Sequence, residues 1–153
     1  MIQRIQSVYL LLVFILAALV IFFPIVEFHA DNQTFYLRVF GFSGADGIEN
    51  LPNASIIGIL TAALGIISIG TIFQFSNRKL QMKLNGVALL VNFGLLISIF
   101  LITDKAVALE KVYDNLEYTY GAFFPIASVL FIILANRSIR KDEALVKQSE
   151  RLR

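Results

Sequence analysis

Residues 84–103 read LNGVALLVNFGLLISIFLIT, a run of 20 residues without a charge that lies between Lys83 and Asp104. About 20 helical residues cross a hydrocarbon core about 30 Å thick, because each residue adds about 1.5 Å. A charged side chain at the bilayer centre costs about 2.5–3.5 kcal/mol, so uncharged runs of this length are typical of membrane-spanning helices. The run therefore predicts a helix that crosses a membrane.

Three further uncharged runs flank this one, at Ile5–Val26, Asn50–Asn77 and Tyr118–Asn136, and they contain 22, 28 and 19 residues. Each is long enough for one crossing and too short for two. The alternation expected of β-barrel strands is absent, so all four must be helices that satisfy their own backbone hydrogen bonds. We predict an all-α integral membrane protein, a single four-helix bundle over residues 1–153 with helices at about 5–26, 54–76, 84–104 and 118–140.

The composition agrees with lipid as the solvent. Hydrophobic residues make up 58% of the chain and charged residues 16%, against about 45–50% and about 25% in soluble domains. The first run is longer than the core of a signal peptide and no small-x-small cleavage site follows it, so we interpret it as a helix that is retained.

Residues suited to catalysis are scarce. There is no cysteine, which excludes disulfides, thiolate metal sites and thiol catalysis. The four runs contain no Asp, Glu, Lys, Arg or His, whereas proton-coupled carriers normally place such a residue in the membrane. The single histidine, His29, lies beside Glu27 and Asp31 in a loop, and we interpret it as a surface residue. We therefore predict no enzyme activity, no catalytic residue, no cofactor and no bound metal.

Basic residues indicate the orientation. The N-terminus, the connection between the second and third helices and the C-terminal tail hold ten Lys and Arg against three acids, while the other two loops hold three against eight. Because basic residues accumulate on the cytoplasmic side, we predict that both termini are cytoplasmic.

The first external loop, residues 27–52, contains short β-prone segments at 28–30 and 34–40 about Asp31-Asn32. This pattern predicts a β-hairpin, whose apolar side of Phe35, Leu37 and Val39 would rest on the bundle or on a partner. Gly41, Gly44 and Gly47, with Ser43 and Asp46, predict a flexible return to the second helix. We expect the third helix to extend into the second external loop, residues 104–117, and the chain then to turn at Asp114-Asn115.

Small and polar residues inside the helices are candidates for helix packing. Small residues at a spacing of four, the small-xxx-small pattern, let two helix backbones approach each other closely, either within one chain or between subunits. The two asparagines of the third helix form interhelical hydrogen bonds of about 0.6 kcal/mol each or line a hydrated path or ligand contact. The candidates are Ala54, Gly58, Ala62, Gly65, Asn85, Asn92, Gly94 and Ser98.

The tail at residues 137–153 is too charged for lipid but favours a helix, with Glu143 and Lys147 as an i,i+4 pair. We expect the fourth helix to continue into it. The tail would bind anionic headgroups, lie in the groove of a partner, or serve only to set the orientation. Its candidate contact residues are Arg140, Lys141, Leu145, Val146, Arg151 and Leu152.

Both ends of the chain resemble one family. MIQRIQSVYLLL at residues 1–12, Phe22-Phe23-Pro24, and IRKDEALVKQSERLR at residues 139–153 are similar to small four-helix membrane proteins of Bacteroidota, domain of unknown function family 4293. The resemblance implies the cytoplasmic (inner) membrane of a Gram-negative bacterium, and no activity. The layout is also similar to the claudin-like arrangement, but this chain lacks the Trp and Cys of that family's loop signature.

From these features we predict a non-enzymatic accessory or scaffold subunit of an inner-membrane protein assembly. Its partners would be membrane lipids and other membrane protein subunits, without nucleic acid. The alternative is a small oligomeric transporter or channel for a neutral or lipid-like solute, built around Asn85 and Asn92. An enzyme ranks third, because only isolated Ser and Glu residues are available.

Overall fold

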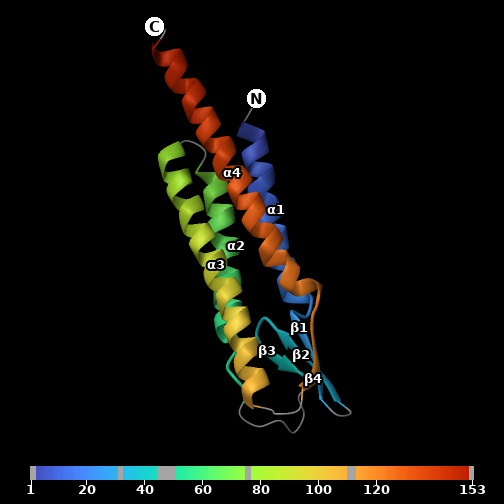
Figure 1. The fold of residues 1–153 in the computed structure, drawn as a ribbon. Coiled ribbons are helices and arrows are strands. Elements are labelled where there is room, and N and C mark those ends of the chain that lie inside the picture. Colours follow the sequence, from blue (N-terminus) through green and yellow to red (C-terminus); the bar gives the residue numbers. More distant parts are fainter. Residues whose placement is uncertain (1–2, 31–32, 45–50, 75–76, 110–112, 152–153) are drawn as a thin grey trace.

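The computed structural model describes residues 3–30, 33–44, 51–74, 77–109 and 113–151. Its four helices are α1 (Gln3–Phe22), α2 (Ser55–Phe73), α3 (Arg78–Leu109) and α4 (Tyr120–Arg151) (Figure 1). Each is long and apolar enough to cross a membrane. The prediction of a bundle of four helices, each apolar enough to cross a membrane, is thereby confirmed.

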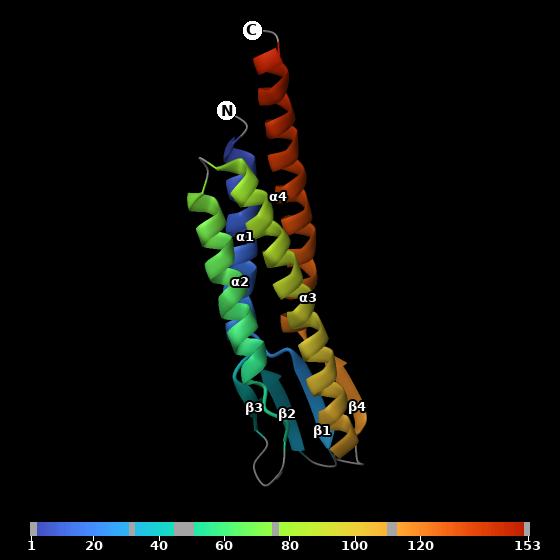
Figure 2. The same cartoon turned by 90° about the vertical axis from the view of Figure 1, so that its left-hand side faces the viewer.

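The helices pack in a ring, in which α1 and α3 each contact both α2 and α4. Every helix contributes to the buried core, with Val13, Leu64, Leu95 and Ile132 as examples. Large apolar side chains also cover the outside of the bundle, as expected where the surroundings are lipid tails that are as apolar as leucine. Both described chain ends lie at one end of the bundle and a small β-sheet lies at the other (Figures 1 and 2).

The sheet has four antiparallel strands in the order β3-β2-β1-β4. They are β1 (Val26–Ala30), β2 (Gln33–Arg38), β3 (Gly41–Ser43) and β4 (Tyr113–Tyr118). The predicted hairpin corresponds to β1 and β2, in which Phe28 is opposite Phe35. Two expectations are wrong: Gly41–Ser43 forms a strand in place of a flexible return, and Asp114-Asn115 lies within β4 in place of a turn.

β4 forms because β1, which pairs with β2 along one edge, has a second edge that can accept another strand. Once α3 has continued to Leu109, the chain returns beside β1, and His29 and Asn115 become cross-strand neighbours. Pairing there satisfies backbone groups that an open edge would leave exposed. This gain overrides the local preference of Asp and Asn for turns.

The inner face of the sheet is apolar and packs on the bundle. The rings of Phe28 and Phe35 stack with centroids 4.8 Å apart, and Phe42 packs beside both. Phe28 and Phe35 belong to the same buried cluster as Ile102 and Ala106 of α3, whose last turns run along the sheet (Figures 1 and 2). Of the two supports considered for the hairpin, the structure therefore shows the bundle.

The helix at the C-terminal end is continuous. α4 runs for 32 residues, through Pro125 in its first turns and on through the charged residues of the tail to Arg151. Its last turns project beyond the neighbouring ends of α1, α2 and α3 (Figures 1 and 2). The expectation that the fourth helix continues into the tail is confirmed.

Candidate functional site

A cluster of polar side chains joins three helices at the end of the bundle that holds the termini. The Gln6 side-chain amide of α1 donates a hydrogen bond to the Asp142 carboxylate of α4. The Arg78 guanidinium, at the start of α3, donates to the backbone carbonyl of Asp142 over 3.0 Å. Only 5% of Asp142 is exposed. We call Gln6, Arg78 and Asp142 the Asp142 cluster, and it holds α4 in place where the helix leaves the bundle.

The position of Asp142 on α4 explains its burial. Ala135, Ile139 and Asp142 are spaced four and three residues apart, so they share one helical face, and all three are buried. Sequence reasoning missed Asp142 because it lies in a run of charged residues. The available signal was its place on the apolar stripe of Ala135 and Ile139, together with an arginine at the start of the third helix.

A second polar contact lies one layer farther into the bundle. The Gln81 side-chain amide donates to the backbone carbonyl of Thr71 over 3.2 Å and links α3 to α2. The hydroxyl groups of Thr61, Ser68 and Thr71 donate to carbonyls four residues earlier in α2. These hydroxyls are therefore satisfied within their own helix.

The two asparagines of α3 differ in their surroundings, although both are fully buried. The Asn92 side-chain amide donates to the backbone carbonyl of Pro125 in α4 over 3.0 Å, which is the interhelical hydrogen bond that one interpretation expects. Neither polar atom of the Asn85 side chain has a partner among the described residues. A buried amide without a partner is costly, so Asn85 is the least satisfied side chain of the bundle interior that the structure describes.

The small residues of α2 do not form one face against one helix. A Cβ atom on Gly58 would lie 2.8 Å from the Phe40 ring, in the turn between β2 and β3, whereas one on Gly65 would lie 3.5 Å from the Phe14 ring of α1. Ala54 is buried just before α2, and Ala62 is exposed.

On α3, a Cβ atom on Gly94 would meet Leu60 of α2 at 3.9 Å. The Ser98 hydroxyl donates to the Leu95 carbonyl of its own helix over 2.9 Å. The small residues thus allow close approaches to the sheet, to α1 and to α2, each at a different point.

The candidate tail residues lie on the projecting part of α4. Arg140, Lys141 and Leu145 are exposed, and Leu145 is 44% accessible. Leu152 lies outside the described residues, as do the side chains of Val146 and Arg151. Ile139, near the start of the tail, is fully buried in the bundle.

The outer face of the sheet is polar and acidic. Glu27 is opposite Tyr36 on one side and Glu117 on the other, and the Glu27 carboxylate raises the pKa of the Tyr36 phenol above its ordinary value. The His29 ring lies 3.7 Å from the Glu27 carboxylate. In the part of the chain that the structure describes, no three His, Asp or Glu side chains converge to hold a metal ion.

One protein-family model matches the chain over residues 2–152, and it is described as Domain of unknown function (DUF4293). The match covers the loops and inner helices as well as the two ends on which the resemblance rests. No curated protein matches the chain.

Proposed function

Because the chain belongs to this family of unknown function, we propose its role from its physical features: a non-enzymatic accessory or scaffold subunit of an inner-membrane protein assembly. The observation that supports the proposal is the projecting end of α4, which is held at its base by the Asp142 cluster. A segment that only sets orientation needs basic residues near the membrane, in any order and without a fixed direction.

The geometry of the projection suits docking. From Asp142 to Arg151 the helix extends about 14 Å at 1.5 Å per residue. Hydrogen bonds from α1 and α3 fix its direction, so less conformational freedom is lost when a partner binds. The exposed Arg140, Lys141 and Leu145 would fit a partner that presents an apolar groove with an acidic rim.

The same proposal includes the membrane and the orientation. Ten of the thirteen basic residues belong to the segments at the end of the termini, which supports cytoplasmic termini and a sheet on the periplasmic side. Reporter fusions test this. Fusions at Asp46 and Glu110 should be active only with a periplasmic reporter, and fusions at Lys79 and Arg153 only with a cytoplasmic one. One reversed position would overturn the orientation.

Co-purification of the full-length protein from native membranes in mild detergent tests the docking. Leu145→Ser should release a stoichiometric partner, because it removes the exposed apolar contact and keeps every charge. The matched control is Ala144→Ser, at the neighbouring exposed position, which should retain the partner. If Leu145→Ser retains every co-purifying protein and full cellular function, the projecting helix is not the docking element.

The unpaired Asn85 favours a second candidate, a small oligomeric transporter or channel for a neutral or lipid-like solute. The chain contains no cysteine, so a single Asn85→Cys substitution would report on water at that depth. Labelling by a membrane-impermeant thiol reagent, in a protein that purifies as a homo-oligomer, would support the transporter. An unlabelled cysteine in a chain that purifies with a different subunit would support the scaffold.

A further inference from the structure

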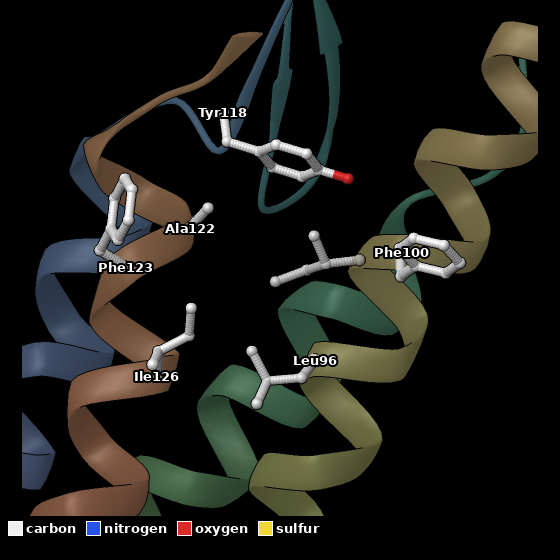
Figure 3. Close-up of a pocket in the computed structure, with 7 residues that line it drawn as sticks. Leu96, Phe100, Tyr118, Ala122, Phe123 and Ile126 are labelled. Carbon is white, nitrogen blue, oxygen red and sulfur yellow. The ribbon is translucent and has the colours of Figure 1, made fainter. Parts of the chain in front are cut away.

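A groove opens on the lipid-facing side of the bundle between α3 and α4, close to the sheet. Its volume is about 320 Å³, and its walls include Leu96 and Phe100 of α3 and Ala122, Phe123 and Ile126 of α4 (Figure 3). All five lie in the uncharged parts of helices that are long and apolar enough to cross a membrane. In a bilayer the groove would face the hydrocarbon, where lipid chains are the most abundant molecules of matching polarity.

The lining of the groove argues for an apolar occupant. Its walls are aliphatic and aromatic side chains, and the Tyr118 hydroxyl is the polar side-chain group among them. A hydrocarbon chain needs no hydrogen-bond partner, so it suits such walls.

Polar groups mark only the sheet end of the groove. Tyr118, the last residue of β4, extends its ring toward α3, with the hydroxyl at the tip (Figure 3). Among the residues that the structure describes, none is hydrogen bonded to this hydroxyl. On α3, the row of Leu96 and Phe100 continues at the same spacing to the exposed Asp104. A tyrosine hydroxyl suits the headgroup depth of a bilayer, and the carboxylate complements a cationic amine.

A second groove supplies a comparison within the same molecule. It lies between α1 and α2, has a volume of about 300 Å³, and is lined by apolar residues that include Ala18, Ile66 and Ile69. The hydroxyl in its wall, that of Thr61, already donates to the Ile57 carbonyl. The second groove thus matches the first in size and apolar character but lacks a free polar group at one end.

We propose that the groove between α3 and α4 binds one acyl chain of a phospholipid with an amine headgroup, whose polar part contacts Tyr118 and Asp104. The lipid comes from the leaflet on the side of the sheet. This proposal is independent of the docking role of α4, because the groove and the projecting end of that helix lie at opposite ends of the bundle.

Photolabelling in vesicles tests the proposal with the full-length protein. The probe is phosphatidylethanolamine with a photoactivatable group in one acyl chain, and phosphatidylglycerol with the same chain is the comparison. Label should appear on the peptides that contain Leu96–Phe100 and Ala122–Ile126. Ile126→Trp fills the groove at a half-exposed position and should reduce this labelling about tenfold, on the scale of a lost binding contact.

The matched control is Ile66→Trp, which fills the second groove and should leave the labelling unchanged. Asp104→Asn should reduce labelling by phosphatidylethanolamine about two- to fivefold, as expected for an exposed charge pair, and leave phosphatidylglycerol unaffected. Melting temperature and elution volume establish that each variant is folded. Should Ile126→Trp not fold, Tyr118→Phe takes its place, because it removes only the hydroxyl.

The labelling results decide whether the site, the headgroup and the kind of occupant are as proposed. Equal labelling of the two tryptophan variants, or label that is absent from both groove peptides, overturns the site. Equal labelling by the two headgroups in the unmodified protein overturns the role of Asp104 and with it the choice of an amine lipid. A cross-linked second copy or other protein at Ile126 would identify the groove as a protein interface and would also overturn the proposal.

Discussion

Stacked aromatic rings close the bundle at the sheet end, whereas three polar side chains close it at the end of the termini. Phe28 and Phe35 are fully buried beneath the sheet, and Asp142 is buried at the other end. Phe28, Phe35 and Asp142 all lie outside the uncharged runs. Burial of apolar rings stabilises the sheet end, whereas hydrogen bonds between helices join the other end. The two ends of the bundle therefore hold their elements together by different interactions.

This difference predicts that the ends respond to different substitutions. At the sheet end, substitutions that change the size or shape of a side chain should destabilise the protein most, because backbone and aromatic rings are in direct contact there. At the terminal end, removal of one polar partner should matter most, because the other partner stays buried without a hydrogen bond.

The largest effect is expected at Gly121, in the first turn of α4. Its backbone N–H donates to the Pro24 carbonyl over 3.1 Å, and an added Cβ atom would overlap that carbonyl. Gly121→Ala should therefore destabilise the protein by about 3 kcal/mol or more, the upper range for overpacking. Gly86→Ala in α3 is the control, because no atom lies within 4 Å of its added Cβ. Unfolding in mixed detergent measures both, and equal stability of the two variants would contradict the tight contact.

The second prediction concerns the Asp142 cluster. Asp142→Ala leaves the Gln6 amide without its acceptor and should cost about 1–3 kcal/mol. Lys141→Ala, at the neighbouring exposed position, should stay within about 0.5 kcal/mol. Spin labels on the projecting part of α4 should also become more mobile in Asp142→Ala alone. Unchanged mobility would show that other contacts direct the helix.

A smaller effect is expected for the aromatic stack. Phe28→Leu removes the ring that stacks on Phe35 and should destabilise the protein by about 1 kcal/mol. Phe93→Leu is the control, because Phe93 is exposed on α3 within the uncharged run and should stay within about 0.5 kcal/mol. The difference between the two melting temperatures measures what the buried stack contributes to stability. Similar losses in both variants would show that the stack stabilises the protein no more than an exposed ring does.

The sequence predicted the four helices because the bilayer leaves few alternatives for a long uncharged run. It also predicted the pairing of β1 and β2, where Phe28 and Phe35 are close in the chain. It could not show that Leu116 would lie beside Phe28, since this pairing joins two loops that are separated by two helices. Local turn signals at Asp114-Asn115 pointed the other way.

The Asp142 cluster was missed for a related reason. Gln6, Arg78 and Asp142 come from three separate segments, and each alone resembles an ordinary polar residue at the membrane boundary. Asn85 and Asn92 were identified as a pair by their spacing. Only the structure distinguishes them, because the partner of Asn92 is a carbonyl of another helix.

The smallest expected effect distinguishes these two asparagines. Asn92→Leu removes the hydrogen bond to the Pro125 carbonyl and should cost about 0.6 kcal/mol, the average for such bonds in membrane bundles. Asn85→Leu removes an amide that has no partner among the described residues, so stability should stay the same or rise by up to about 1 kcal/mol, the desolvation cost that is avoided. Unfolding of both variants in the same detergent gives the comparison. A loss at Asn85 as large as that at Asn92 would mean that a water or solute satisfies Asn85 in the membrane, and a hydrated path beside α3 would then become the better explanation of that residue.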